Sequence, residues 1–189
     1  RYQIETDIRM QTASYEMING LSEVIGKYDA VILDLWGVVH DGVTPYPNSI
    51  AAMTALKEAG IPVALLSNAP RRSSVVVKRM EDMGISRDLY GPAVASGEVA
   101  YAQLVARSDP WYAKLGRKVL MVGPVRDMSM FENQDVEIVT EVDDADWVLI
   151  TGPNEDHDQV SKYEDLLHAL KARDLPVLCP NPDREVIRG

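Results

Sequence analysis

One stretch constrains the fold more than any other: the apolar run at 30–33 leads directly into Asp34, and turn-forming residues follow it at Gly37 and at 41–42. A short continuous run of this kind, bounded by turn signals, predicts a strand buried on both faces of a parallel sheet. Asp34 would then lie at the carboxyl end of that strand, where open α/β sheets place their ligands. An aspartate there can also merely cap a turn, so the rest of the chain must decide between a structural and a functional role.

The residues that follow predict a regular alternation of helix and strand. Good N-cap residues and glycine stops separate short apolar runs, and this order with short connections indicates a parallel sheet with right-handed crossovers. The expected elements are a helix over 48–59, a strand over 61–68, and helices over 71–83 and 98–106. The sequence therefore predicts an α/β fold.

The sequence pattern changes near residue 108, where short apolar runs separated by polar segments begin. We predict a domain boundary there. The first part, 1–107, is expected to form an α/β core whose first residues are flexible. The second part, 108–189, is expected to form another α/β unit of shorter strands. Its expected elements are strands over 118–122, 136–139, 147–150 and 176–179, with a long helix over 159–172.

The amino-acid composition limits which partners the protein can bind and in which compartment it can work. The net charge of −10 argues against a nucleic-acid backbone as partner, and no apolar run approaches the ~20 residues of a membrane span. The single cysteine, Cys179, excludes an internal disulfide and fits a reducing cytoplasm. Its apolar neighbours predict a buried structural thiol.

The carboxyl ends of the first two expected strands carry the candidate chemistry. Asp34 ends the first strand, and Ser67 with Asn68 ends the second. Because neighbouring parallel strands end at the same edge of a sheet, these side chains should lie close together. A carboxylate there could attack a phosphorus centre, while the hydroxyl and nearby backbone N–H groups hold the phosphoryl oxygens.

These residues resemble the haloacid dehalogenase superfamily. The segment 34–38 with HisAspGly at 40–42 looks like its motif I, and LeuLeuSerAsn at 65–68 looks like its motif II. The spacing and the run SerAsnAlaProArgArg point to the class IIA branch, the nitrophenylphosphatase-like phosphatases. The segment 96–100 resembles the entrance to that branch's cap domain, and AsnProAsp at 181–183 resembles its exit.

The resemblance implies a Rossmann-like core with an inserted α/β cap of the C2a type. It also implies Mg²⁺-dependent hydrolysis of a small phosphorylated metabolite through an aspartyl-phosphate. Carried over by position, Asp34 is the nucleophile and a metal ligand, and the backbone carbonyl of Trp36 is a second ligand. Ser67 and Asn68 bind the phosphoryl group, and Arg71 lies on the substrate side of the same loop. Such proteins are often dimers through the cap, so a homodimer is expected as well.

The acidic turn GluAspHisAsp at 155–158 allows two interpretations. It can be the N-terminal turn of the following helix, which the helix dipole favours. If the resemblance holds, the turn follows a cap strand near the active-site mouth, and His157 there can bind substrate.

Two features depart from the phosphatase pattern. The family's second aspartate, which protonates the leaving oxygen, is replaced by Trp36, and an indole cannot exchange a proton in that role. We therefore expect slow hydrolysis and a long-lived phosphoenzyme, or a catalytically weakened protein that binds a phosphorylated ligand or a partner. The family's later Lys and GlyAsp motifs are also missing. The sequence is thus expected to lack the C-terminal part of the core and to be inactive by itself, with apolar surfaces uncovered.

A receiver domain of two-component signalling is a less favoured alternative. Its phosphorylated aspartate also ends a strand, and the pair at 41–42 follows Asp34 at a suitable distance. Receivers need an acidic pair on an earlier strand, however, and only 33 residues precede Asp34.

Overall fold

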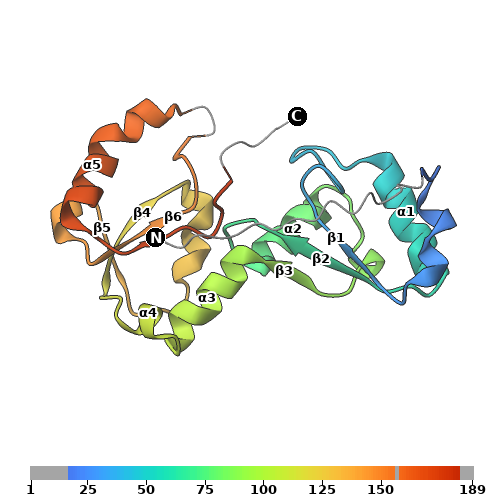
Figure 1. The fold of residues 1–189 in the computed structure, drawn as a ribbon, viewed down its shortest axis with the longest axis horizontal. Coiled ribbons are helices and arrows are strands. Elements are labelled where there is room, and N and C mark those ends of the chain that lie inside the picture. The colour runs from blue at the N-terminus through green and yellow to red at the C-terminus, as the bar shows by residue number, and fades with distance from the viewer. Residues whose placement is uncertain (1–16, 156–157, 184–189) are drawn as a thin grey trace, which may run out of the picture.

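The structure, a computed structural model, describes residues 17–155 and 158–183. These residues form two α/β units, and helix α3 (Ser96–Ala106) leads from the first to the second (Figure 1). The first residues, predicted to be flexible, and the candidate His157 lie outside the described ranges.

The first unit is built on a three-stranded parallel sheet in the order β1-β2-β3. Its strands are β1 (Val31–Leu33), β2 (Val63–Ser67) and β3 (Ala93–Ala95). Helices α1 (Pro47–Glu58) and α2 (Ser73–Asp82) bury Met53 and Met80 in one core cluster with strand residues such as Leu65. Short 3₁₀ turns complete the unit at Leu21–Glu23, Ile25–Lys27 and Arg87–Leu89.

The strands of this sheet are buried on one face only. Ile32, Leu66 and Val94 are 69%, 53% and 42% exposed, whereas their neighbours Leu65 and Ala95 are 1% exposed. The prediction that the first strand is buried on both faces is therefore wrong for the described residues. The physical reason is that α1 and α2 pack into the same cluster, so the opposite face of the sheet is left without a layer of its own.

Three helix starts differ from the predicted ones by one or two residues; one is α3, which was expected from 98 and begins at Ser96. Helix α1 begins at Pro47, after Tyr46, because proline fits the first helical turn, where its missing N–H costs nothing. Helix α2 begins at Ser73, since Arg72 still has extended backbone angles. The strand β3 was not predicted, because a three-residue strand offers too few positions for a period.

The second unit has a four-stranded parallel sheet in the order β5-β4-β6-β7. Its strands are β4 (Lys118–Val122), β5 (Glu137–Val139), β6 (Trp147–Ile150) and β7 (Val177–Leu178). Alternate residues of β6 enter different clusters: Trp147 and Leu149 pack with Leu104 of α3, while Val148 packs with Leu170 of α5. The two central strands of this sheet are therefore covered on both faces.

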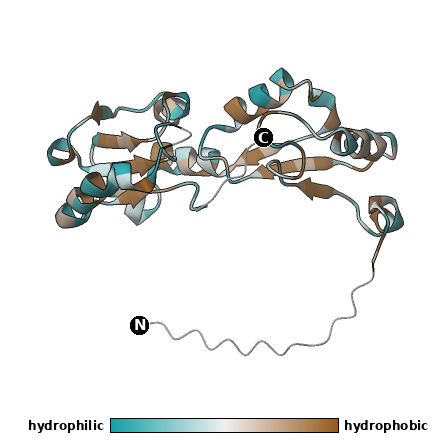
Figure 2. Ribbon diagram, turned by 90° about the horizontal axis from the view of Figure 1, so that it is seen from above, coloured by the Kyte–Doolittle hydropathy of each residue, from teal (hydrophilic) through white to brown (hydrophobic). Residues whose placement is uncertain are grey.

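The connections of the second unit are mostly single helical turns. They are α4 (Pro110–Ala113), η4 (Val125–Phe131), η5 (Val142–Asp144) and η6 (Val160–Tyr163), followed by α5 (Glu164–Arg173). The helix predicted over 159–172 thus starts as a 3₁₀ turn and becomes α-helical only at Glu164. Figure 2 shows hydrophobic colour concentrated in the strands of both sheets. Over the described ranges, no helix has both the length and the apolar character that crossing a membrane requires.

Cys179 is exposed, so the prediction of a buried thiol is wrong. Strand β7 ends one residue earlier, at the edge of the sheet, and the chain then turns away. The Sγ atom lies 3.1 Å from the backbone oxygen of Asn181.

Candidate active site

The carboxyl ends of β1 and β2 meet at one hollow on the surface of the first unit. Asp34 directly follows β1, and Ser67 is the last residue of β2. Together with Asn68 and Ser96 they line a hollow of about 520 Å³, whose floor is the exposed apolar face of the sheet. The sequence-predicted group Asp34, Ser67 and Asn68 is thus brought together, in a space that suits a small ligand.

The Asp34 carboxylate is exposed to this hollow. Its Oδ1 accepts a hydrogen bond from the backbone N–H of Leu35 at 2.6 Å, which fixes the orientation of the side chain. Among the described residues no hydrogen bond reaches Oδ2. One oxygen is therefore held and the other is open to an incoming electrophile.

Trp36 is held by the turn that follows β1. An added Cβ at Gly42, where φ is +89°, would stand 2.2 Å from the indole ring, so only glycine fits beneath it. The ring also meets His40 edge to face, with 5.7 Å between the ring centroids. In the class IIA phosphatases that this sequence resembles, the position two residues after the nucleophile carries the proton donor. Here the packed indole of Trp36 occupies that position.

His40 is 5% exposed and belongs to the same turn. Its Nδ1 accepts the N–H of Gly42 at 2.9 Å, so this nitrogen carries no proton. Burial lowers the pKa of His40, and the charge of Arg79 lowers it further, while Asp41 and Asp34 oppose these effects. The imidazole is therefore kept neutral as a structural acceptor.

Asp41, like His40, stabilises the turn by accepting hydrogen bonds from backbone N–H groups. Its Oδ1 accepts the N–H groups of Val43 and Thr44 at 2.8 and 2.7 Å. The hydrogen bond from Thr44, followed by that from Val43, lowers the pKa of Asp41. These contacts make Asp41 part of the turn that follows β1.

The loop after Ser67 is fixed against the start of α3. Ser67 is 9% exposed, and its Oγ accepts the N–H of Ala69 at 3.2 Å, which leaves its own hydroxyl hydrogen available for donation. The carbonyl of Ala69 accepts hydrogen bonds at 3.0 Å from the Gly97 N–H and the Ser96 hydroxyl. A Cβ at Gly97 would lie 2.3 Å from the backbone nitrogen of Arg71, so glycine is required for this close approach.

Asn68 connects the loop to the segment where the chain returns from the second unit. Its Nδ2 donates to the carboxylate of Asp183 and, at 3.4 Å, to Oδ1 of Asn181. The Asn181 oxygen also accepts the Asp183 N–H at 3.0 Å, which shapes this segment into a small turn. The AsnProAsp motif therefore lies beside the candidate phosphate loop.

Arg71 points from the same loop toward the second unit. Its Nε lies 3.2 Å from Oδ1 of Asp127 in η4, and the two side chains are 19% and 1% exposed. Burial lowers the pKa of Arg71 and raises that of Asp127, while the attraction between the two charges opposes both shifts. Asp127 is not among the site residues predicted from the sequence. The one sequence feature that could have indicated a buried Asp127 is its spacing of three residues from Met130, which places both side chains on the same face of a 3₁₀ helix.

The donor atoms near Asp34 fit the type of metal that the resemblance implies. Carboxylate and carbonyl oxygens, here Asp34 and the backbone of Trp36, are the ligands that Mg²⁺ prefers, and water and substrate usually supply its remaining ligands. Across residues 17–155 and 158–183, however, no three His, Cys, Asp or Glu side chains gather closely enough to hold a metal. Asp34 and the Trp36 carbonyl are thus donors of the type that Mg²⁺ prefers.

Comparisons with known proteins agree with this geometry. A family model described as haloacid dehalogenase-like hydrolase matches residues 31–137. A haloacid dehalogenase-like hydrolase from Brucella suis is 33% identical, with a TM-score of 0.82. A p-nitrophenyl phosphatase from Archaeoglobus fulgidus is 26% identical, with a TM-score of 0.54. A glycerol phosphate phosphatase from Mycobacterium tuberculosis, solved with calcium, is 19% identical, with a TM-score of 0.55.

The extent of these matches differs between the chains. The alignments cover 92%, 82% and 84% of this chain, but 61%, 56% and 44% of the three similar proteins. A search of curated proteins finds no match. The family model covers β1 with the Asp34 that follows it, the loop of Ser67 and strand β4 of the second unit, and it ends at Glu137, the first residue of β5. On this evidence the chain belongs to the haloacid dehalogenase-like hydrolase family, in the class IIA branch that its motifs indicate.

Proposed function

We propose that the protein is a Mg²⁺-dependent phosphatase of a small phosphorylated metabolite, with Asp34 as the nucleophile. The observation that carries the proposal is the exposed Asp34 carboxylate, which shares one hollow with Ser67 and Asn68. The names of two similar structures, a p-nitrophenyl phosphatase and a glycerol phosphate phosphatase, support the same class of reaction.

The first step transfers the phosphoryl group to the protein. An oxygen of Asp34 attacks phosphorus, and the bond between phosphorus and the ester oxygen breaks. The Ser67 hydroxyl and backbone N–H groups of its loop hold the phosphoryl oxygens, with Asn68 and Arg71 beside them. A bound Mg²⁺, held by the Asp34 carboxylate and the Trp36 carbonyl, would neutralise negative charge on the phosphoryl group.

The second step returns Asp34 to its original state. Water attacks the phosphorus of the aspartyl-phosphate, the carboxylate leaves, and inorganic phosphate is released. In both steps a proton must move, to the leaving oxygen and from the attacking water. The indole of Trp36 can do neither, and general acid–base help is typically worth ~10²–10⁴-fold in rate. We therefore expect slow turnover and an accumulating phosphoenzyme.

The second unit is proposed as the cap, with the boundary between core and cap near residue 108. The chain reaches this unit through α3 and returns beside Asn68, so both crossings lie at the candidate site. His157 in the acidic turn of this unit is proposed to contact substrate. A homodimer through the cap and a location in a reducing cytoplasm complete the proposal, the latter because the chain carries a single, exposed cysteine.

A catalytically weakened protein that binds a phosphorylated ligand is the second candidate. The observation that favours it is Trp36, which occupies the position of the proton donor and is packed against Gly42 and His40. Such a protein would keep the phosphate loop and lose turnover.

Hydrolysis of a panel of phosphate esters by the full-length protein with Mg²⁺ separates the two candidates. We expect slow release of phosphate that Asp34→Asn reduces by at least about 10³-fold, because the nucleophile is lost. Asp29→Asn serves as the matched control, since Asp29 is an exposed aspartate at the opposite end of the same strand. Binding of phosphate esters without turnover would favour the weakened protein, and equal activity of the Asp34→Asn variant would sink the proposed enzyme.

A further inference from the structure

Two consecutive arginines reach from the candidate phosphate loop to the second unit. Arg71 pairs with Asp127 at 3.2 Å, and Nη1 of Arg72 lies 3.5 Å from Glu132. Asp127 lies within η4 and Glu132 directly after it. One short loop of the first unit therefore holds one short segment of the second unit through two ion pairs.

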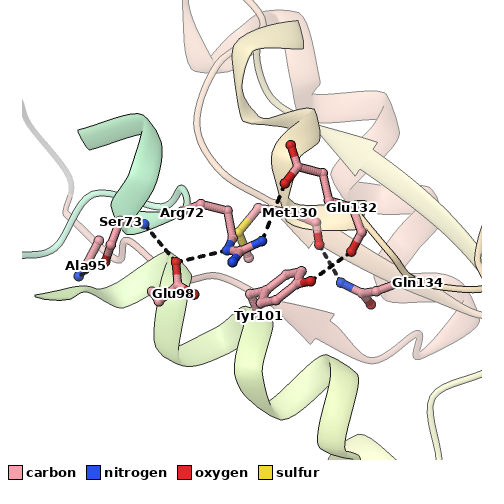
Figure 3. A network of polar contacts seen from close by, with 8 residues as sticks. All are labelled: Arg72, Ser73, Ala95, Glu98, Tyr101, Met130, Glu132 and Gln134. Carbon is pink, nitrogen blue, oxygen red and sulfur yellow. Dashed lines mark hydrogen bonds and ion pairs between the residues drawn. The ribbon is translucent and has the colours of Figure 1, made fainter. Parts of the chain in front are cut away.

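Arg72 is fully engaged in this contact (Figure 3). Its Nε donates to Glu98 at 2.9 Å, and the same carboxylate oxygen accepts the Ser73 N–H at 2.8 Å. The guanidinium lies over the ring of Tyr101, 3.5 Å from its centroid, and the Tyr101 hydroxyl donates to the backbone of Glu132 at 3.0 Å. Hydrogen bonding to Glu98 raises the pKa of Arg72. Arg72 is thus a structural contact between the units.

Arg71 is engaged quite differently. Asp127 is its one side-chain partner among the described residues, and its buried Nε makes no well-aligned hydrogen bond. Both oxygens of Asp127 and the nearby Thr151 hydroxyl are buried and make no well-aligned hydrogen bond, although the Thr151 hydroxyl lies close enough to Asp127 to lower the pKa of that carboxyl. Buried charges without hydrogen bonds are costly, and such exceptions in a folded protein call for a functional explanation.

A purely structural role explains this pair poorly. The desolvation of two buried charges often exceeds their attraction, so apolar side chains of similar size would join the units at least as well. The neighbouring Arg72 already joins the same two segments through a hydrogen bond from its Nη1 to Glu132 at 3.5 Å. What the pair with Asp127 adds is a defined position for the Arg71 guanidinium, whose other N–H groups remain unused by the described residues.

We propose that Asp127 is a positioning residue: it holds the Arg71 guanidinium beside the loop of Ser67, where Arg71 binds the phosphoryl group or another anionic group of the substrate. This inference rests on the proposed function of that loop. Because Asp127 belongs to the second unit and Arg71 to the first, correct placement of the second unit is required for tight anion binding.

The test is a double-mutant cycle on binding of inorganic phosphate to the full-length protein with Mg²⁺, followed by calorimetry. Asp127→Asn is expected to weaken phosphate binding roughly tenfold, because it releases a charged partner of Arg71. In an Arg71→Met background the same change should alter affinity by less than about twofold, since Asp127 acts only through Arg71. Glu132→Gln is the matched control: it removes the carboxylate paired with Arg72 from the same segment and should leave affinity within about twofold.

Two binding results would overturn the proposal. The first is an Asp127→Asn variant that is less stable yet binds phosphate as the wild type does, which would make the pair merely structural. The second is a full further loss in the Arg71→Met background, which would mean that Asp127 acts independently of Arg71. If Asp127→Asn does not fold, Asp127→Glu keeps the charge and shifts the guanidinium by one methylene. Weaker phosphate binding by Asp127→Glu supports positioning, and unchanged affinity contradicts it.

Amide hydrogen exchange of the ligand-free protein separates failure of this inference from failure of the proposed function. If the wild-type protein binds no phosphate, the proposed function fails, and exchange in residues 68–72 then tests the geometric half of the inference, that Asp127 holds the loop of Arg71 in place. Positioning predicts exchange at least about fivefold faster there in Asp127→Asn than in Glu132→Gln. Equal exchange in the two variants would contradict it.

Discussion

The two sheets are made from similar apolar strands, yet they are covered differently. In the second sheet, Trp147, Val148 and Leu149 are consecutive and all 0% exposed. In the first sheet, Leu65 is 1% exposed while Leu66 beside it is 53% exposed. Helices α3 and α5 contribute to clusters on opposite faces of the second sheet, whereas α1 and α2 share a single cluster on the first.

This difference shows what an apolar run can and cannot predict. A continuous apolar run indicates that a strand can be buried on both faces, because all its side chains are apolar. It does not tell where the second covering layer comes from. In the described residues the open face of the first sheet is also the floor of the hollow beside Asp34, so the same surface bears on both stability and function.

Truncating matched leucines of the two sheets should give the largest contrast. Leu149→Ala is expected to lower the free energy of unfolding by about 2–5 kcal/mol, because it leaves a cavity in a closed core. Leu66→Ala should cost less than about 1 kcal/mol, since that side chain is already half exposed. Urea unfolding of both variants is the measurement. Equal losses would mean that a further layer covers Leu66 in solution.

Glycines after the strands provide a second, smaller contrast. A Cβ at Gly123, directly after β4, would stand 1.9 Å from Oγ1 of Thr151, whereas nothing lies within 4 Å of one at Gly37 after Asp34. Gly123→Ala should therefore cost about 1–3 kcal/mol from overpacking, in addition to the strain of alanine at a φ of +155°. Gly37→Ala, where φ is +79°, should cost only the conformational strain of about 1 kcal/mol. Thermal unfolding that ranks Gly37→Ala as the more damaging change would contradict the close packing at Gly123.

The first unit should contribute a pH dependence of stability through His40. Burial lowers the pKa of His40 in the folded protein, so the unfolded chain binds the proton more readily. The stability due to neutral His40 is therefore complete above the unfolded pKa of about 6.5 and is lost as pH falls through the folded pKa. Unfolding measured between about pH 7.5 and 5.5 should show this loss, and His40→Asn, which can still accept the Gly42 N–H, should reduce it. An unchanged pH dependence in His40→Asn would show that another group is responsible.

Much of the fold could be predicted because its signals are local. The strands at 118–122 and 147–150 are found as predicted, since their apolar runs are continuous and end at polar residues. Strand β3 and the 3₁₀ start of the last helix were missed, because three or four residues are too few for a period. Exposure of Cys179 and Leu66 depends on which layers cover a sheet, and no local pattern carries that information.

The residues of the candidate site likewise fall into two groups, those that local sequence predicts and those that depend on contacts distant in sequence. Asp34, Ser67 and Asn68 follow their strands directly, so parallel topology alone predicts that they meet. Asp127 could not be found in this way, because its partner Arg71 is distant in sequence and lies in the other unit. Likewise, the contact of Asn68 with Asp183 depends on how the chain returns from the second unit.

The central claim, that Asp34 is a nucleophile whose phosphoenzyme is long-lived, can be tested by trapping. The full-length protein is mixed with Mg²⁺ and a phosphate ester, quenched in acid, digested, and examined by peptide mass spectrometry. We predict that the peptide containing Asp34 carries one phosphoryl group, and that Asp34→Asn abolishes this modification. Steady phosphate release with an unmodified Asp34 peptide at every quench time, or the same labelling in Asp34→Asn, would contradict the claim.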